Sequence, residues 1–267
     1  MRMPTQILIA TFMGLWHNGR ALLSCAVMPL VLLMIWEVSP NYAAALEWLE
    51  RQVGANLAAW ANGAFITSVF AAIGFCWLRR CFTPLKRNAP LAICTFLAAI
   101  LAVETVKYGL FYQLDAIDTA LSLEASNRQL RGAPNALIEA LRVAVYWVGT
   151  GGVYTLIAML SLWPADLALG LRGSPALAVR KTRQAIVPIA CCVAAILALS
   201  AAGDALSKRA VAAAIERADY SIDLHGLYFI ALTAVFVLAS WIPPLMFLAL
   251  SRALFAEYSS ARTSSQE

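Results

Sequence analysis

Charged residues are scarce in this sequence of 267 residues: 13% are Asp, Glu, Lys or Arg, while 61% are hydrophobic. A soluble domain usually has about 25% charged and about 45–50% apolar residues. The few charges are also unevenly distributed, because whole stretches of about 20 residues carry almost none, which is the pattern of membrane-spanning helices. This composition excludes an ordinary soluble domain, and we expect an all-α, polytopic helical membrane protein.

Histidine and the usual catalytic or metal-binding motifs are also lacking. His17 and His225 fall on opposite predicted sides of the membrane, so they cannot share a metal ion or a catalytic triad. The sequence contains no HExxH, no GxSxG and no paired carboxylates within an apolar segment. The six cysteines form no CxxC pair, and we expect buried, free thiols; a disulfide between Cys191 and Cys192 is the less favoured alternative. We therefore expect no metal, no cofactor and no enzymatic activity.

Six apolar segments predict six transmembrane helices. A cleaved signal peptide within residues 1–45 is the alternative for the first segment, but its polar first part of about 20 residues is too long for that class. Pro243 and Pro244 remove backbone donors and should bend the last segment. The predicted spans are 21–36, 62–78, 90–112, 143–163, 185–202 and 227–254.

The distribution of Lys and Arg predicts which side of the membrane each loop occupies. Twelve basic residues lie in the termini and in the loops after the second and fourth spans, against seven on the other side. The acidic residues show the opposite bias, three against eleven. Because cytoplasmic loops are enriched in Lys and Arg, both termini should be cytoplasmic in a multi-pass protein of the bacterial inner membrane. The net charge of +5 is then a topology signal, and we expect no nucleic-acid partner.

The predicted domain organisation is simple. Residues 1–255 should form a single six-helix transmembrane domain, and residues 256–267 a short polar cytoplasmic tail.

Two segments resemble each other and suggest an internal repeat. Residues 83–102 and 174–198 both begin with a hydroxyl residue followed by proline, at Thr83 and Ser174. Both continue through a basic cluster to a second proline, and then through P-x-x-x-C into AAILA. A hydroxyl N-cap followed by proline favours the start of a helix. A degenerate third copy begins at Pro4.

The repeat predicts a helical-hairpin unit. Each unit would contain a short amphipathic helix on the cytoplasmic surface, a span outward, an external helix and a span back. Leu46 and Leu49 mark the apolar face of the first external helix, with charged residues on its other faces. The expected external helices lie within 42–58, 114–142 and 204–217.

The segment SPALAVRKTRQ, followed by a span, carries a family resemblance. Ser174, Pro175, Ala178 and Thr182 fill the pattern S-P-x-x-A-x-x-x-S/T, and the resemblance covers residues 165–200 best. It is similar to YciC-type bacterial polytopic inner-membrane proteins and to the membrane domain attached to some glycerophosphodiester phosphodiesterases. The usual aromatic residue at the end of the basic segment is missing. The resemblance implies a multi-pass membrane protein without defined chemistry, and the sequence contains no phosphodiesterase catalytic domain.

Glu104 and Lys107 are the candidate intramembrane polar site, because ionisable residues inside a membrane are costly and commonly functional. Their i,i+3 spacing places them on one helix face as an ion pair. One interpretation is structural or interfacial, with Lys107 reaching the headgroups beside Tyr108. The other is a path for a substrate or for protons.

Small residues in the fourth and fifth spans are candidates for helix packing. Glycines permit close helix approach, or an unwound segment of the kind that lines transporter cavities. Alanines at a spacing of four form one face of the fifth span, so we expect it to pack against the fourth. The residues are Gly149, Gly151, Gly152, Ala190, Ala194 and Ala198.

Basic residues at the cytoplasmic ends are candidate contacts for anionic lipid headgroups, and aromatic residues near span ends should form an interfacial belt. The candidate lipid contacts are Arg79, Arg80, Lys86, Arg87, Arg180, Lys181 and Arg183. The expected belt residues are Trp16, Trp36, Trp77, Tyr112 and Trp163.

These features favour a non-enzymatic inner-membrane protein that acts as a scaffold or interacts with lipid. The alternative is a small transporter or permease that uses Glu104, Lys107 and the glycine-rich segment of the fourth span. An intramembrane enzyme is disfavoured, since no catalytic constellation is apparent. Expected partners are the lipid bilayer, anionic headgroups, and a membrane-protein partner or a second copy of the chain.

Overall fold

The computed structural model describes residues 4–82, 89–130, 135–217 and 240–258, and these parts of the chain are almost entirely α-helical, without a strand. The predicted all-α class is therefore confirmed. Five of the described helices are long and apolar enough to cross a membrane. The elements are α1 (Pro4–Val38), α2 (Pro40–Val53), α3 (Ala55–Cys81), α4 (Ala89–Leu130), α5 (Ala136–Leu160), α6 (Leu162–Ala168), α7 (Pro175–Thr182), the 3-10 turn η1 (Arg183–Ala185), α8 (Ile186–Arg217) and a helix at 240–258.

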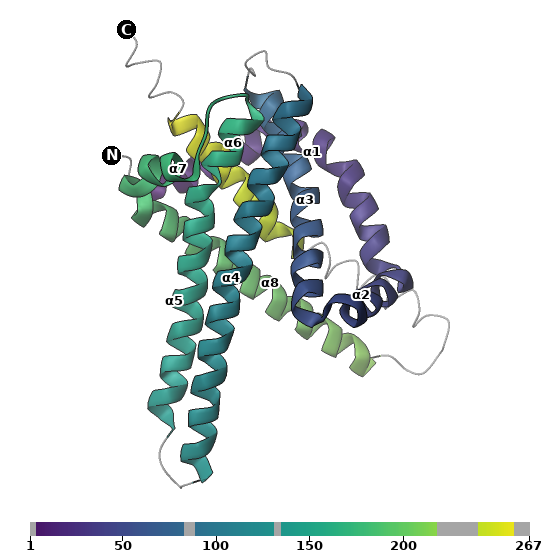
Figure 1. Cartoon of the computed structure of the whole chain (residues 1–267), viewed down its shortest axis with the longest axis vertical. Helices are drawn as coiled ribbons and strands as arrows, with labels where there is room; N and C mark the ends of the chain where they lie inside the picture. The colour runs from purple at the N-terminus through teal and green to yellow at the C-terminus, as the bar shows by residue number, and fades with distance from the viewer. Residues whose placement is uncertain (1–3, 83–88, 131–134, 218–239, 259–267) are drawn as a thin grey trace.

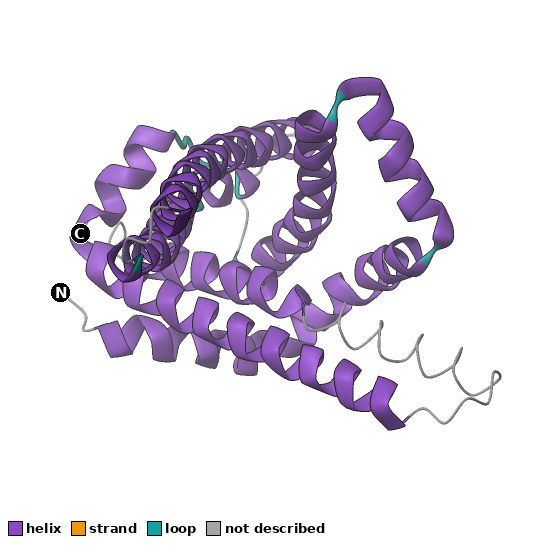
Figure 2. Cartoon of the chain, turned by 90° about the horizontal axis from the view of Figure 1, so that it is seen from below, coloured by secondary structure: helices purple, strands orange, loops and turns teal. Residues whose placement is uncertain are grey.

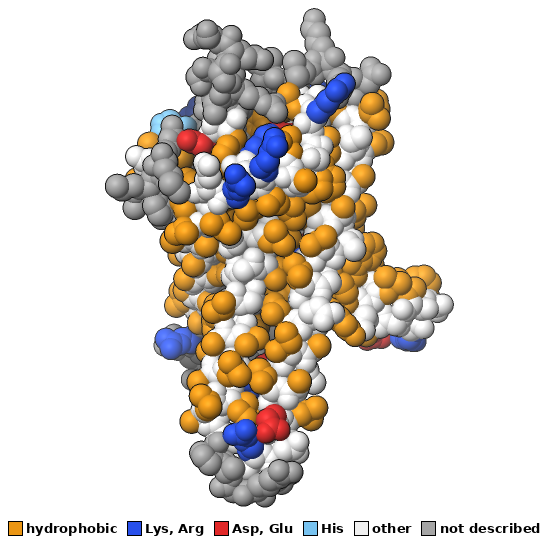
Figure 3. Space-filling view, turned by 60° about the vertical axis from the view of Figure 1, so that its left-hand side comes forward, with side chains coloured by type: hydrophobic (Ala, Val, Ile, Leu, Met, Phe, Trp, Pro, Cys, Tyr) orange, Lys and Arg blue, Asp and Glu red, His pale blue; other side chains and the backbone are white. Residues whose placement is uncertain are grey.

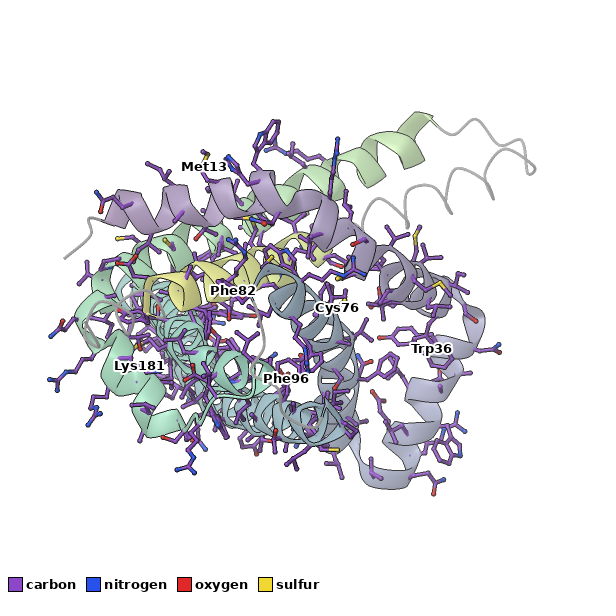
Figure 4. The ribbon with its side chains drawn as sticks, turned by 90° about the horizontal axis from the view of Figure 1, so that it is seen from above. Met13, Trp36, Cys76, Phe82, Phe96 and Lys181 are labelled. Atoms are coloured by element: carbon purple, nitrogen blue, oxygen red, sulfur yellow. The ribbon has the colours of Figure 1, made fainter. Side chains whose placement is uncertain are left out.

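Helix α1 has two parts that meet at a kink. Asn18 has non-helical backbone angles (φ −112°, ψ 15°), and its side-chain amide donates to the Gly14 carbonyl at 3.2 Å. The first part, which carries Met13, lies across one end of the molecule, and the second part descends beside α3 (Figure 4). This arrangement matches the predicted surface helix followed by a span.

Helix α2 is short because residues that start and stop helices lie at its two ends. The Ser39 side chain accepts a hydrogen bond from the Asn41 amide at 3.2 Å, and Pro40 occupies the first helical turn. At the other end, Gly54 has φ 85°, a conformation that L side chains rarely adopt. The chain then reverses into α3, so α2 corresponds to the external helix predicted within 42–58.

Helices α4 and α5 form a long antiparallel hairpin that projects past the rest of the molecule (Figure 1). With 42 residues, α4 is about 63 Å long, roughly twice the hydrocarbon thickness of a bilayer. The guanidinium of Arg142 donates to both carboxylate oxygens of Asp118, at 3.0 and 3.2 Å, and thereby joins the two helices. The separate external helices predicted within 114–142 and 204–217 are wrong, because α4 continues to Leu130, α5 begins at Ala136 and α8 continues to Arg217.

The segment from α6 to α8 turns the chain at the end opposite the tip of this hairpin. Gly170, with φ 76°, follows α6, and a short loop then leads to α7. Ser174 caps α7 by accepting from the Leu177 amide at 3.2 Å, with Pro175 in the first turn, which confirms the helix start predicted at this position. The equivalent start at Thr83 lies outside the described residues. The beginning of α1 and the end of helix 240–258 lie at the same end as α7 (Figure 1).

The core consists of two groups of buried side chains. The larger joins α1, through Ile7, and helices α3 to α8 to helix 240–258, and includes Ile189, Val193 and Leu250. The smaller joins α1, α3 and helix 240–258 around Ile73 and Trp77, both fully buried. Trp77 therefore lies in the core, and its predicted place in an interfacial aromatic belt is wrong.

Five of the six predicted spans lie within described helices, and the sixth is described only in part, at 240–258. Its helix continues to residue 258, beyond the predicted domain boundary at 255, and the rest of the predicted tail lies outside the described residues. Pro243 and Pro244 lie near the start of the described helix at 240–258, and the residues before 240 are outside the described part of the chain. The expected bend therefore stays a prediction.

The cysteines match the prediction only partly. All six are free, so Cys191 and Cys192 form no disulfide. Cys25 and Cys192 are buried, whereas Cys94 and Cys191 are exposed on the surfaces of their helices, contrary to expectation.

The surface has the distribution of polarity that a bilayer requires. Hydrophobic side chains cover the middle of the visible face, and charged side chains gather toward its two ends (Figure 3). Many large apolar residues of the long helices are exposed, among them Val148 at 75% and Val187 at 63%. Viewed from below, the described elements are helices joined by short loops, and none of them is a strand (Figure 2). The architecture is that of a multi-pass membrane protein.

Candidate functional site

The predicted ion pair exists and is buried. The Lys107 Nζ lies 2.6 Å from Glu104 Oε1, as the i,i+3 spacing on α4 predicts. Glu104 is only 5% exposed, and its second oxygen, Oε2, accepts a hydrogen bond from the Thr67 hydroxyl of α3 at 3.0 Å. Both carboxylate oxygens are thus occupied, which compensates much of the cost of burying the charge.

Helix α3 approaches the carboxylate closely because of a glycine. A Cβ atom on Gly63 would lie 3.2 Å from Glu104 Oε1, tighter than most contacts of real side chains. Gly63 and Thr67 are one helical turn apart on α3, so the two residues face α4 together. Neither residue was predicted to belong to the site. The sequence pattern that could have indicated them is a glycine and a hydroxyl residue four positions apart in an apolar helix.

The ion pair lies at the wall of a cavity of about 330 Å³ inside the helix bundle. The cavity lies between α3, α4, α5 and helix 240–258, and its remaining lining is mainly hydrophobic. The lining includes Tyr154, whose ring stacks on Phe247 with 5.2 Å between centroids. A mostly apolar cavity with a few convergent polar groups is the usual form of a small-molecule site, and this volume is at the low end of the common range of about 300–1,000 Å³.

A second, smaller cavity of about 110 Å³ continues the first. The two share seven lining residues, including Ala71, Ile100 and Phe247, and the smaller one extends to Phe96 on α4 and Leu78 on α3. From Lys107 to Phe96 the distance along α4 is about 16 Å at 1.5 Å per residue. The combined space is elongated, with the Glu104–Lys107 pair and the Thr67 hydroxyl toward one end and mainly apolar side chains along the remainder, where Ser161 and Ser251 add hydroxyl groups.

The ion pair lies below the outer surface of the bundle, not at its rim. The Tyr108 hydroxyl donates to the Asn56 carbonyl at 2.6 Å, so this part of α4 is level with the first turn of α3. Gly63 and Thr67 are about 12 and 18 Å further along α3. Glu104 is thus buried in the protein, while 25% of the Lys107 side chain is exposed. The structural or interfacial interpretation and the path for a substrate or for protons both stay predictions.

The glycine-rich segment of α5, at Gly149, Gly151 and Gly152, does not line the cavity. Its glycines bear on how closely α5 packs against its neighbours. A Cβ atom on Gly149 would lie 2.5 Å from Leu114 Cδ2 of α4, so glycine allows close approach there. Gly151 and Gly152 have open space at the corresponding position. Helix α5 is continuous from Ala136 to Leu160. Gly149 allows close helix approach as predicted, but its partner is α4 and not the expected α8, and the unwound segment required by the transporter alternative is absent from α5.

The alanine stripe of α8 does not form the predicted contact with α5. Helix α8 does contact α5, but its buried face carries Ile189, Cys192 and Val193. Ala194 and Ala198 are exposed, and Ala190 is half-buried. Branched side chains bury more apolar area than alanine, so they occupy the face that packs within the chain.

The basic residues predicted to contact lipid differ in their surroundings. Arg180 of α7 and Arg183 of the following turn η1 are exposed, while Lys181 donates to the buried carboxylate of Asp166 on α6 at 2.9 Å. Figure 4 places Lys181 on the α7 side of the molecule and Trp36 on the α2 side. The pairing of Asp166 with Lys181 was not predicted, because the two residues are 15 positions apart in the sequence. Lys86 and Arg87 lie outside the described residues.

The arginines at the end of α3 interact with their neighbours. Arg79 lies over the Phe75 ring at 5.4 Å, and Arg80 donates to the Ser24 hydroxyl of α1. A third arginine that sequence reasoning did not single out, Arg252, contacts the faces of Trp77 and Phe82, each 5.6 Å from its guanidinium carbon. The contacts of Arg79 and Arg252 are cation–π interactions, in which the positive guanidinium group is attracted to the face of an aromatic ring.

Within the described residues, no three His, Cys, Asp or Glu side chains are grouped so that they could hold a metal ion. The cavity supplies one neutral ion pair, hydroxyl groups and an apolar lining. Comparison with protein-family models, curated proteins and solved structures finds no match. The resemblance to YciC-type proteins therefore stays a prediction.

Proposed function

We propose that this chain is a non-enzymatic, multi-pass protein of the bacterial inner membrane that binds a lipid-like amphiphile inside the bilayer. The observation that carries the proposal is the elongated apolar cavity with the buried Glu104–Lys107 pair at its wall. An apolar chain gains free energy by filling such a space, at about 0.8 kcal/mol per methylene removed from water. The polar groups then determine which end of the molecule enters and how it is oriented.

The exposed arginines of α7 support a second contact with lipid, at the membrane surface. Arg180 and Arg183 are exposed on a helix whose opposite side, at Ala178 and Thr182, is fully buried. Each basic residue near an anionic leaflet contributes about 1 kcal/mol of attraction. With both termini cytoplasmic, as the distribution of basic residues favours, α7 would lie against the cytoplasmic headgroups. The protein would thus act as a lipid-binding scaffold, alone, with a membrane-protein partner or as a homo-oligomer.

A substitution pair tests the cavity directly. Ala71 lines both parts of the cavity, while its neighbour Ala72 is exposed on the outside of α3. Ala71→Leu should reduce binding of a fluorescent single-chain lipid probe at least tenfold in nanodisc-reconstituted protein. Ala72→Leu introduces the same side chain on the lipid side and should bind as the wild type does. Equal binding by both variants, with unchanged thermal unfolding, would refute the proposal.

The transporter alternative retains one supporting observation, the burial of Glu104 beside the cavity. It predicts that Glu104→Gln abolishes a flux while leaving probe binding measurable. A lipid-binding scaffold predicts no flux of the probe across proteoliposomes in either protein, so one transport assay distinguishes the two functions.

A further inference from the structure

We propose that the cavity selects an uncharged, single-chain amphiphile whose polar end is a hydroxyl group, such as a long-chain alcohol. This inference rests on the proposed function and adds the chemical class of the ligand. It follows from three properties of the site: its charge balance, its unused hydrogen-bonding capacity and its dimensions.

The ion pair has no net charge. Glu104 and Lys107 carry opposite charges 2.6 Å apart, and the carboxylate side chain is 7% exposed. The pair is therefore neutral as a unit in an apolar lining. A ligand with a net charge would add an uncompensated charge to this space, and burying such a charge is costly. A carboxylate head would be repelled by Glu104 and an ammonium head by Lys107, so a neutral head is favoured.

The unused hydrogen-bonding capacity specifies the head further. An ammonium group has three donors, of which Lys107 directs one at Glu104. A carboxylate has about four lone-pair sites, of which Glu104 uses two, toward Lys107 and Thr67. The pair can therefore offer both a donor and an acceptor to a ligand. A hydroxyl group is the smallest neutral group that accepts from Lys107 and donates to Glu104 at once.

The remaining polar groups near the pair fit a small head. The Ser161 hydroxyl donates to the Ala158 carbonyl at 2.7 Å, so its donor is already used. Gly63 leaves no side chain between α3 and the carboxylate, and a Cβ there would already approach Oε1 at 3.2 Å. A hydroxyl needs less of the space beside the pair than a phosphate or a sugar.

The dimensions favour one chain. The main cavity measures about 330 Å³, near the lower limit for ligand sites, and its extension adds a narrow space of about 110 Å³. The lining beyond the pair is mainly apolar, as at Ile100, Ala71 and Phe96, with the hydroxyls of Ser161 and Ser251 among these side chains. A single alkyl chain fits an elongated space of this size, while a phospholipid with two chains and a large head is too bulky.

A matched ligand series tests the inference in the wild-type protein. Dodecanol, dodecyl methyl ether, dodecanoate and dodecylammonium share one chain and differ only at the head. Each would compete with the fluorescent single-chain probe in nanodiscs at equal mole fraction in the membrane. We expect dodecanol to compete at least tenfold better than the ether, which cannot donate, and than both ions. If dodecanoate or dodecylammonium competes best, the inference is wrong although the proposed cavity function stands. If no member competes, both are wrong.

Two variants test the charge balance separately. Glu104→Gln leaves Lys107 as an unpaired cation and should shift the preference toward dodecanoate by at least tenfold. Lys107→Gln leaves an unpaired carboxylate and should shift the preference toward dodecylammonium. If the order of the four ligands is the same in folded Glu104→Gln and Lys107→Gln proteins as in the wild type, the pair does not select the head and the inference is overturned.

Discussion

Lys181 of α7 donates to the carboxylate of Asp166 on α6 at 2.9 Å, and this buried pair holds the surface helix against the bundle. The aspartate side chain is 5% exposed and the lysine 19%. The loop between them is tight, because a Cβ on Gly173 would lie 2.9 Å from Asp166 Cβ. Lys181 therefore has an internal partner, and Arg180 and Arg183 are the α7 residues available to lipid headgroups.

Breaking this pair should destabilise the fold around α7. Asp166→Leu leaves the Lys181 ammonium unpaired in a largely buried position, which typically costs about 3–5 kcal/mol. The double variant Asp166→Leu/Lys181→Met removes both charges and should recover most of the loss, since an apolar pair replaces a buried ion pair well. Thermal unfolding in detergent measures both, and Arg180→Met, on the exposed face, serves as the control. Similar melting temperatures for the single and double variants would contradict the prediction.

The hydrogen bond from Thr67 to Glu104 should stabilise the contact between α3 and α4. Thr67→Val keeps the shape and removes the hydroxyl donor, with an expected loss of about 1.5–3 kcal/mol for a bond to a charged acceptor. Thr67→Ser keeps the donor and should lose clearly less. Chemical unfolding in mixed micelles compares the two variants. If Thr67→Ser is as unstable as Thr67→Val, the packing of the methyl group, not the hydrogen bond, would explain the effect.

The three glycines of α5 should respond differently to alanine. Gly149→Ala places a methyl group 2.5 Å from Leu114 Cδ2, so Leu114 must move, at an expected cost of about 1–3 kcal/mol. Gly151→Ala and Gly152→Ala meet open space and should leave stability unchanged or raise it by up to about 1 kcal/mol. Leu114→Ala should relieve the clash when combined with Gly149→Ala. Equal melting temperatures for all three single variants would show that the α4–α5 contact tolerates the extra methyl group.

The ion pair between Arg142 and Asp118 should contribute little. Both side chains are partly exposed, at 28% and 38%, and such pairs usually contribute less than about 1 kcal/mol. Arg142→Met should therefore lower the melting temperature only slightly, and this difference should shrink between low and high salt because ions screen exposed charges. A large decrease that is independent of salt would indicate that this part of the hairpin is enclosed by an apolar environment.

The predicted orientation can be tested with reporters fused to the chain. A fluorescent reporter that matures only in the cytoplasm should be active at the C-terminus and inactive when inserted at 131–134, between α4 and α5. The opposite pattern would invert the topology. It would also place the exposed arginines of α7 on the outer surface, where the proposed contact with the anionic cytoplasmic leaflet could not form.

Local features of the structure were predictable where a single segment determines them. The Ser174–Pro175 start of α7 and the Glu104–Lys107 pair depend on spacings of one to three residues. The exact ends of α2, at Ser39 and Gly54, were not predicted, although a helix was expected within 42–58. In contrast, α4 continues past the predicted end of its span because no proline or glycine occurs between Leu110 and Leu130 to interrupt it.

Features that join distant segments could not be derived from the sequence. Thr67 reaches Glu104 across 37 residues, and Arg252 covers Trp77 from a helix near the other end of the chain. The small-residue stripe of α8 was misleading for a related reason. In an alanine-rich span several faces look suitable for packing, and only the positions of the neighbouring helices decide that Ile189 and Val193 face inward.

The length of α4 makes it a lever arm. The same uninterrupted helix carries Glu104 at the cavity and Leu130 near the outer tip of the hairpin, about 39 Å apart along the axis. A tilt of α4 by about 10° around Glu104 would displace the tip by about 7 Å on this geometry. On the proposed function, a ligand whose entry tilted α4 in this way would move the tip of the hairpin, far from the cavity itself.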